Sequence, residues 1–457
     1  MTGRAVGYRW VLAGGVVLMV VAAVLGVALV RPWDGDTGLA VTPSPTPPAE
    51  PVAVLSAAET VPAPTAAGVE RAIKELVDEA GEAGKLSVSV VDATTGAPLY
   101  ERAATTAAIP ASTIKLLTAA AVLTTLDPAD QLATTVVAGD QPGEVVLVGG
   151  GDPTLAIDEH GFYPDAARLD ELADQVRAAL PPGTEITEVT VDSSLFTGPV
   201  HGPWDSDIPG GGYVGPITAL MTDGGRKDPD PEQGHVASER WEEPDLAAGR
   251  AFAELLGLAE ADVERGEAPP QAQELGRVLS PPIQRLVEIM LVHSDNVVAE
   301  VLARQVALAR GEPASYQGGS AAMAEALATE LGLTGVTFTD GSGLSRGNRV
   351  TAGLLTQLLA KAVDPAHPEL AGLVTGLAVA GWSGTLADRF DDPEYAPAVG
   401  WVRAKTGTLA GVHTLAGLVT TADGQLLAFA LLANEAPEEI RGDLDRIVAA
   451  LAGCGCA

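Results

Sequence analysis

The chain has 457 residues, of which 47% are hydrophobic, enough for two or three domains with a large core. Its net charge of −33 and sequence pI near 4.3 argue against nucleic acid as a partner, because nucleic-acid-binding proteins present basic surfaces. Two cysteines, both at the C-terminal end, exclude a zinc site built from cysteines.

Residues 11–30 form an uncharged apolar run of 20 residues. At about 1.5 Å per residue, a helix of this length crosses about 30 Å of hydrocarbon. Arg4 and Arg9 precede the run, which favours a short cytoplasmic segment at 1–10 and a body outside the cell membrane. We therefore predict a single-pass transmembrane anchor at 11–30. The alternative is a cleaved signal peptide, which would release a secreted protein.

Residues 34–66 contain seven prolines among Thr, Ser and Ala. This composition predicts a semi-extended Pro-rich linker rather than a packed domain. The linker would hold the rest of the chain away from the bilayer.

The elements that follow alternate between helix and strand. The first block, 67–127, predicts a helix at 68–83, a hairpin of strands 86–92 and 98–102, and a helix that starts near Pro110. The block 128–275 differs because it contains a long loop-rich part at 201–234. Its predicted elements are strands at 145–148 and 188–192 and helices at 169–180 and 246–256. We predict that it is one inserted α/β domain.

The block 276–453 returns to regular α/β alternation and is expected to complete the domain begun at 67–127. Its predicted elements are helices at 282–292, 297–309 and 438–452 and strands at 399–406, 412–420 and 425–433. The tail 454–457 carries Cys454 and Cys456, which either pair in an oxidising compartment or stay free.

Ser112 and Lys115 stand three residues apart at the start of an apolar helical run. Residues three apart share a helix face, so the lysine amine can lie against the serine hydroxyl. Serine needs a base within hydrogen-bond reach, and lysine is a base only when neutral. Neutrality near pH 7 requires its pKa to fall by about 3 units, and we expect a second cation to contribute more than burial. The pair therefore predicts another lysine nearby.

Two further patterns are built from rare residues, since the chain has only six lysines and three asparagines. Ser-Asp-Asn at 294–296 lies between two predicted helices, and Lys-Thr-Gly-Thr at 405–408 ends a predicted strand. Lys405 is a candidate for the second cation. We expect Asp295 to be structural and to face away from the site, and His293 to have a packing or hydrogen-bonding role.

The three patterns together resemble the active site of the serine penicillin-recognising enzymes. The details resemble their D-alanyl-D-alanine carboxypeptidase/endopeptidase branch, the low-molecular-mass class C penicillin-binding proteins of the penicillin-binding protein four type. The resemblance covers residues 67–453 and implies an αβα transpeptidase-like catalytic domain at 67–127 and 276–453.

The family often carries two nested inserted domains. Here the innermost one is expected to be absent or reduced to loops at 200–235. The stretches that carry the branch-specific resemblance are 150–155, 293–296 with 299–300, 340–346, and 383–386 with Arg389.

The resemblance also implies roles for the chemistry. Ser112 would be the acylated nucleophile and Lys115 its proton acceptor. Ser294 would relay protons to the leaving group, Asn296 would hold the substrate amide, and Lys405 would support the electrostatic field.

The residues implied to bind substrate lie on the third pattern. Backbone N–H groups of Ser112 and Thr408 would form the oxyanion hole. The substrate would be a peptidoglycan stem peptide ending in D-Ala-D-Ala, and β-lactams would acylate Ser112 and remain. No metal or cofactor is required. The implied substrate-binding residues are Thr406, Gly407 and Thr408.

Two other functions stay open at this stage. A β-lactamase shares the three patterns, although the block 128–275 and the linker argue against it. A non-catalytic cell-wall or β-lactam-binding protein could retain the same fold. The balance between carboxypeptidase and endopeptidase activity is also open.

Overall fold

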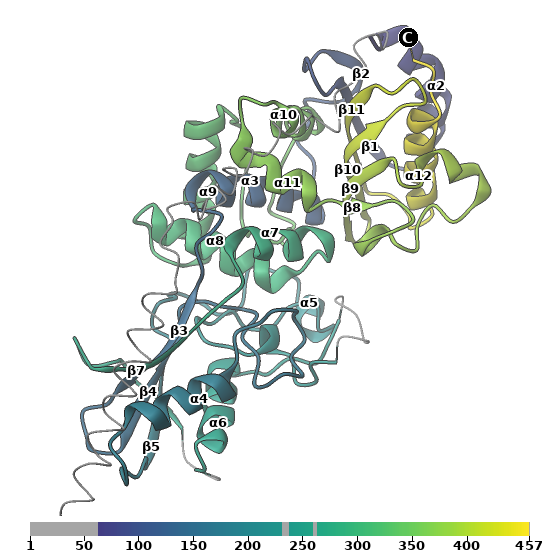
Figure 1. Cartoon of the computed structure of the whole chain (residues 1–457). Coiled ribbons are helices and arrows are strands. Elements are labelled where there is room, and N and C mark those ends of the chain that lie inside the picture. The colour runs from purple at the N-terminus through teal and green to yellow at the C-terminus, as the bar shows by residue number, and fades with distance from the viewer. Residues whose placement is uncertain (1–62, 231–236, 259–262, 457) are drawn as a thin grey trace, which may run out of the picture. The chain divides into compact units, whose positions relative to one another are not determined.

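The computed structural model describes residues 63–230, 237–258 and 263–456 (Figure 1). The predicted anchor at 11–30 and most of the linker at 34–66 lie outside these residues and stay predictions. Among the described helices, none combines the length and the apolar character that crossing a bilayer requires. Helix α2 (Ala66–Ala80) begins behind Thr65, whose side chain accepts the N–H of Gly68, so the linker prediction runs one residue into this helix.

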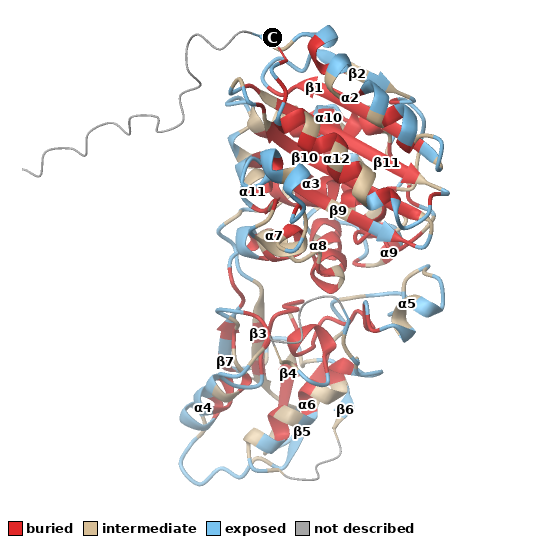
Figure 2. Cartoon of the chain, turned by 90° about the vertical axis from the view of Figure 1, so that its right-hand side faces the viewer, coloured by how far each residue is buried: buried red, intermediate tan, exposed pale blue. Residues whose placement is uncertain are grey.

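Six strands form an antiparallel sheet in the order β2-β1-β11-β10-β9-β8. Alternate residues of its strand β11 enter two different cores: Phe429 and Leu431 one, Ala430 and Leu432 the other. Because side chains alternate across a strand, helices must cover both faces of this sheet. Figure 2 shows β10 and β11 buried along most of their length. The strands are β1 (Lys85–Asp92), β2 (Pro98–Arg102), β8 (Ala378–Val379), β9 (Val402–Leu409), β10 (Val412–Thr420) and β11 (Leu426–Asn434).

The helices on the two faces come from different parts of the chain. One face carries α2 and α12 (Ile440–Ala452), which pack against each other. The other face carries the helices that begin with α3 (Lys115–Thr125), and α10 lies directly on β1 and β11. The predicted αβα layers are confirmed in this sandwich, but the regular α/β alternation expected for 276–453 is wrong, because five α-helices follow one another between 283 and 375 before the strands from 378 to 434. The remaining helices of the second face are α7 (Ile283–Val292), α8 (Asn296–Ala309), α9 (Tyr316–Leu331), α10 (Ala352–Val363) and α11 (Ala371–Thr375).

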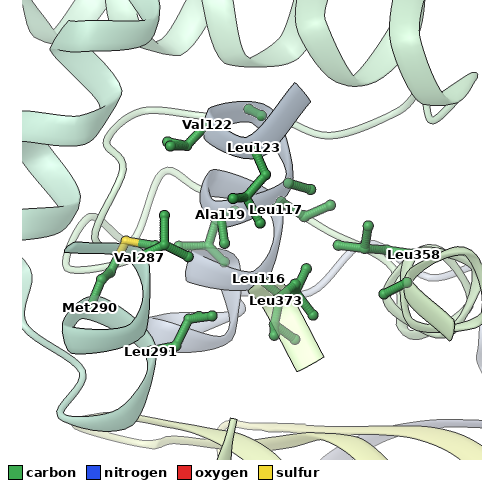
Figure 3. Close-up of a cluster of buried hydrophobic side chains, with 14 of the residues drawn as sticks. Leu116, Leu117, Ala119, Val122, Leu123, Val287, Met290, Leu291, Leu358 and Leu373 are labelled. Carbon is green, nitrogen blue, oxygen red and sulfur yellow. The ribbon is translucent and has the colours of Figure 1, made fainter. Parts of the chain in front are cut away.

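Helix α3 is the centre of the second core. Every residue from Lys115 to Leu123 is buried. Figure 3 shows Leu116 and Leu117 of α3 among Val287 and Leu291 of α7, with Leu358 of α10 on the other side. A helix that is apolar all round must be enclosed in this way, and this burial fixes the position of the residue pair at its start.

A second sheet has the order β6-β5-β4-β3-β7. Strand β3 pairs antiparallel with β4 and β7, whereas β4, β5 and β6 run parallel. Its core contains Leu169, Leu172 and Val176 of α4 and Phe252 of α6. These elements are β3 (Ala133–Ala138), β4 (Glu144–Val148), β5 (Glu188–Asp192), β6 (Glu264–Arg265), β7 (Glu274–Leu279), α4 (Leu169–Ala179) and α6 (Pro244–Leu255).

The loop-rich part at 201–234 has little regular structure where it is described. It contains only the short helix α5 (Asp207–Gly210) and the 3₁₀ turn η2 (Asp223–Gly225). The boundary predicted at 275/276 falls inside β7, which pairs with β3. The domain boundaries themselves stay predictions.

Strand β9 differs from the predicted strand 399–406 in a way that matters for the site. It begins at Val402, because Gly400 has φ +78° in the turn before it, and it ends at Leu409. The Lys-Thr-Gly-Thr pattern at 405–408 therefore lies within the strand, and pairing with β10 continues through it.

The cysteine-containing tail is packed against the start of α2. Cys454 and Cys456 are bonded to each other and are both buried. The carbonyl of Cys456 accepts the N–H of Thr65 at 2.8 Å. A Cβ on Gly68 would lie 2.3 Å from that same carbonyl oxygen, so this close approach requires glycine.

Candidate active site

The start of α3 brings Ser112 and Lys115 together. Ser112 lies in a 3₁₀ turn, η1 (Ala111–Ile114), and Lys115 is the first residue of α3. Because residues three apart eclipse each other in a 3₁₀ turn, the Lys115 Nζ lies 3.0 Å from the Ser112 Oγ. Ala111 has φ +46° although it is not glycine, so the backbone immediately before the serine is strained.

The Lys115 amine has three polar contacts. Besides the Ser112 Oγ, its Nζ lies 2.7 Å from the Asn296 Oδ1 and 2.6 Å from the Ser342 carbonyl oxygen. Both of these oxygens can only accept a hydrogen bond. A neutral lysine donates two N–H bonds to them and keeps its lone pair for the serine hydroxyl. The geometry therefore suits lysine as the base.

Burial is the main influence on both lysines of the site. Burial lowers the pKa of Lys115 to about 8, although the carboxylates of Asp340, Glu300 and Asp295 act to raise it. Burial also lowers the pKa of Lys405 well below its usual value, and repulsion from Lys115 adds to this. Repulsion between the two amines thus lowers the pKa of Lys405, whereas the pKa of Lys115 is lowered by burial and not by a second cation. The expectation that a second cation contributes more than burial is wrong, because both side chains are completely enclosed.

The connection between α7 and α8, together with Asn296 at the start of α8, carries two predicted site residues. Ser294 has φ +59°, a left-handed conformation that non-glycine residues rarely adopt. Asp295 is buried and caps α8, where its side chain accepts the N–H of Val298. Burial would raise the pKa of Asp295, but the guanidinium groups of Arg226 and Arg240 hold it at about 2. The predicted structural role of Asp295 agrees with these contacts.

Strand β9 supplies the opposite wall. Lys405 is buried and donates a hydrogen bond to the Thr406 carbonyl at 2.9 Å. Gly407 passes so close to η1 that an added Cβ would lie 2.9 Å from the Ser112 backbone nitrogen and 2.2 Å from the Thr414 Oγ1. The Thr414 hydroxyl also donates to the Pro110 carbonyl at 2.8 Å, which ties the sheet to the turn that carries the serine.

The predicted residues converge on one cavity of about 600 Å³. Lys115 and Lys405 lie buried behind its wall, and neither side chain is exposed to solvent. Loops from the block 128–275 form part of the same wall, through Asp205 and Tyr213. The predicted site residues that line the cavity are Ser112, Ser294, Asn296, Thr406 and Thr408.

Ser342 was missed as a contributor to the site. Its carbonyl contacts Lys115, and its position is fixed because Glu300 accepts the N–H groups of Gly341 and Ser342 at 3.1 and 2.8 Å. The sequence offered one signal, the Gly-Ser-Gly stretch at 341–343. A Cβ on Gly343, which has φ +89°, would lie 2.1 Å from the carbonyl oxygen of Ala111, so only glycine allows this approach.

Two further contacts of the cavity wall were not predicted, although the second of them, at Thr385, lies in the stretch 383–386 that carries the family resemblance. The Tyr213 carbonyl accepts a hydrogen bond from the Asn296 Nδ2 at 2.9 Å. The Thr385 hydroxyl lies 2.9 Å from the Thr406 hydroxyl. Among the described residues, no group of three or more His, Cys, Asp or Glu side chains is arranged to hold a metal ion.

A serine in contact with a buried lysine, with an asparagine and a second buried lysine beside an antiparallel sheet, is the arrangement expected of a serine hydrolase of the penicillin-recognising class. Comparison with known proteins identifies the family. The sequence matches the profile of the D-Ala-D-Ala carboxypeptidase 3 (S13) family over residues 69–241 and 229–451. The chain belongs to this family of serine-type D-Ala-D-Ala carboxypeptidases, as the sequence patterns predicted.

Individual relatives agree with this assignment. The chain is 41% identical over 423 residues to a carboxypeptidase of Mycobacterium tuberculosis, covering 91% of this chain and 90% of that protein. It is 39% identical over 449 residues to carboxypeptidase DacB of Mycolicibacterium smegmatis, covering 96% of both. The crystal structure of penicillin-binding protein 4 from Haemophilus influenzae shares the fold, with a TM-score of 0.67 at 23% identity over 82% of this chain and 97% of that one.

Proposed function

We propose that this carboxypeptidase acts outside the cell membrane on peptidoglycan stem peptides, from which it removes the terminal D-Ala through an acyl-enzyme on Ser112. The observation that carries the proposal is the 3.0 Å contact between the Lys115 Nζ and the Ser112 Oγ. Since the other two contacts of this amine are carbonyl oxygens, its neutral form has a lone pair available only toward the serine.

Acylation begins when Lys115 takes the proton of the Ser112 hydroxyl as the oxygen attacks the amide carbon between the two D-Ala residues. The developing oxyanion is bound by the backbone N–H groups of Ser112 and Thr408. The close passage of Gly407 past the Ser112 nitrogen supports this pairing, because it brings β9 and η1 to the same point.

The leaving D-Ala needs a proton on its nitrogen before the C–N bond breaks. Lys115, now an ammonium, returns the proton it accepted, and Ser294 passes it to that nitrogen. Thr406 and Thr408 hold the carboxylate of the leaving residue, and the field of Lys405 favours this negative charge. Water then attacks the ester, with the same lysine as base, and restores the free serine.

The peptide would bind along the edge of β9. Strand β8 pairs with β9 only at residues 403–404, and within the described residues no strand covers 405–409 on the side away from β10. An extended peptide can add to such an edge through main-chain hydrogen bonds. This mode places the scissile amide of a stem peptide next to Ser112.

β-Lactams would use the first half of the same reaction. Attack by Ser112 opens the lactam ring, but the nitrogen that leaves stays tethered to the acyl group and obstructs the water. Penicillin-binding protein 4 of Haemophilus influenzae, which shares the fold, has been crystallised with a β-lactam, which supports this proposal.

The location follows from the N-terminal residues. An anchor at 11–30 with a Pro-rich linker at 34–66 would place the catalytic residues outside the membrane, within reach of the cell wall. Separation of membrane and soluble fractions tests this part, because recovery of the full-length chain in the soluble fraction alone contradicts an anchor.

The test of the reaction compares the wild-type chain with Ser112→Ala. We expect a labelled penicillin to attach to wild type only, and mass spectrometry of muropeptides to show loss of single D-Ala residues by wild type only. Cleaved cross-links would add endopeptidase activity. Rapid turnover of a chromogenic cephalosporin would instead indicate a β-lactamase, and neither labelling nor products would indicate a non-catalytic protein.

A further inference from the structure

Asp295 lies between two residues of the active site, and its side chain is contacted by residues of the inserted block. Its Oδ1 accepts the N–H of Val298 at 3.0 Å, which fixes the start of α8. Its Oδ2 accepts the hydroxyl of Tyr163 at 2.7 Å. Both carboxylate oxygens are thus used for positioning. The residues on either side are Ser294, with its strained backbone, and Asn296, which contacts Lys115.

The groups that hold Asp295 come from the block 128–275. The Arg226 Nη2 lies 3.5 Å from the Asp295 Oδ2, and its Nη1 donates to the Tyr163 hydroxyl at 2.9 Å. The Arg226 guanidinium also stacks on the ring of Phe162, 3.6 Å from its centre. Arg226, Tyr163 and Asp295 are each at most 3% exposed. Because solvent is excluded from these groups, their charged hydrogen-bond network has a single well-defined geometry.

The same block also fixes the amide of Asn296. The Nδ2 of this residue donates to the Tyr213 carbonyl at 2.9 Å, which leaves its Oδ1 to accept from Lys115 at 2.7 Å. If the amide turned over, an N–H donor would face the lysine, and the lone pair of Lys115 would be drawn away from Ser112. Residues on both sides of Asp295 therefore depend on contacts from the inserted block.

We propose that Tyr163 and Arg226 are positioning residues for the acylation step: through Asp295 they hold Ser294 and Asn296 in the arrangement that activates Ser112. The inserted block is then part of the catalytic machinery rather than an appendage to it. This inference rests on the proposed function, since it concerns the same acyl-enzyme.

The test is Tyr163→Phe, which removes one hydroxyl and keeps the ring. We expect the acylation rate constant with a labelled penicillin to fall about tenfold, while the dissociation constant of the complex that precedes acylation changes less than twofold. The matched control is Tyr316→Phe. Tyr316 is a buried tyrosine whose hydroxyl donates to the Val200 carbonyl of the same block at 3.2 Å and whose ring stacks with an arginine, Arg304. The control should acylate within twofold of wild type.

A double-mutant cycle asks whether Tyr163 acts through Asp295. If it does, Tyr163→Phe combined with Asp295→Asn acylates no more slowly than Asp295→Asn alone. Effects that multiply independently overturn the proposal, and so does wild-type acylation by Tyr163→Phe or an equal loss in Tyr316→Phe.

If Tyr163→Phe does not fold, Arg226→Lys takes its place. The acylation rate constant should again fall while the dissociation constant stays nearly unchanged. A wild-type chain that is never acylated contradicts the proposed function itself, which is a separate result.

Discussion

The two walls of the catalytic cavity are built in different ways. The wall formed by β9 is held by a continuous main-chain ladder with β10, in which Thr406 pairs with Leu415 and Thr408 with His413. The opposite wall, at 294–296, has no ladder, and side chains from distant parts of the chain fix it. A ladder tolerates most side-chain changes, whereas a network of buried contacts loses its geometry when one member is removed. Function should therefore be more sensitive to the loss of a single side-chain hydrogen bond on the second wall.

Lys115→Met should produce the largest effect, because it removes the base around which both walls are organised. We expect the acylation rate to fall at least about 1,000-fold, since a general base contributes about 10²–10⁴-fold and no other basic side chain among the described residues contacts the Ser112 hydroxyl. The free energy of unfolding should change by less than about 2 kcal/mol, because relief of the buried amine offsets the hydrogen bonds that are lost. Penicillin labelling and thermal unfolding measure the two quantities.

The control for this substitution is Lys74→Met. Lys74 is exposed and, within the described part of the chain, forms an ion pair only with Asp78 on the surface of α2, so both quantities should stay close to wild type. If Lys115→Met acylates within tenfold of wild type, a different group is the base, and Lys115 is not the residue around which the two walls are organised.

Gly407→Ala tests the main-chain wall where it has no room to adjust. The new methyl would meet the Thr414 hydroxyl, the Pro110 carbonyl and the Ser112 nitrogen at 2.2, 2.8 and 2.9 Å, so β9 must move away from η1. We expect acylation to slow about 100-fold, as for loss of an oxyanion donor, with about 2 kcal/mol of lost stability. Stopped-flow acylation and urea unfolding measure the two effects.

The matched substitution is Gly442→Ala in α12, where an added Cβ has 3.7 Å to its nearest neighbour, the Tyr395 hydroxyl. It should leave acylation unchanged and stabilise the helix by up to about 1 kcal/mol. A Gly407→Ala variant with wild-type acylation would show that the oxyanion is bound elsewhere.

The pH dependence of acylation reports on Lys115 directly. Its pKa is lowered from 10.5 to about 8, so the neutral, reactive form increases as pH rises through 8. The acylation rate should increase about fivefold from pH 7 to pH 8 and level off above that, as the neutral fraction requires. Asn296→Asp sharpens the test, because a carboxylate beside the ammonium favours the charged form and moves this increase to higher pH. A wild-type profile that is flat between pH 6 and 9 contradicts lysine as the titrating base.

The lowered pKa of Lys115 also makes the free energy of unfolding depend on pH. Between about pH 8 and 10.5 the unfolded chain keeps the Lys115 proton and the folded chain does not, so stability rises with pH across this window. Below pH 8 both forms bind the proton, and the folded state carries the full cost of the buried ammonium, about 3 kcal/mol.

The sequence predicted the residues of both walls better than the contacts that hold them, for a physical reason. The serine-lysine spacing is local, so Ser112 and Lys115 could be paired from their neighbours, and short patterns of rare residues marked 294–296 and 405–408. The carbonyls of Ser342 and Tyr213 are backbone groups that every residue has, and they reach the site only through tertiary packing. No pattern of residue types marks the Tyr213 carbonyl, and the Gly-Ser-Gly stretch at 341–343 is the one signal for the Ser342 carbonyl.

The cause of the lysine pKa shifts shows the same limit. Local sequence indicated that two ammonium groups would meet, and they do interact. It could not show that both would be completely enclosed, because that enclosure is built by α3, α8 and β9, three elements that are far apart in the sequence. Burial therefore outweighs repulsion, which the spacing of residues alone could not indicate.

Thr385→Val should have the smallest effect, because it alters the main-chain wall at a single hydroxyl. Thr385 lies in a 3₁₀ turn and its Oγ1 is 2.9 Å from the Thr406 Oγ1, so it orients a hydroxyl that the proposed mechanism uses to hold the leaving carboxylate. Valine has the same shape without the hydrogen bond. We expect KM for a D-Ala-D-Ala peptide to rise about threefold with kcat unchanged, because the bond aids binding in the ground state and transition state alike. Thr375→Val removes a hydroxyl that donates to the Gly372 carbonyl at the end of α11, and should change neither constant. A tenfold loss of kcat in Thr385→Val would mean that this wall, too, depends on a side-chain network.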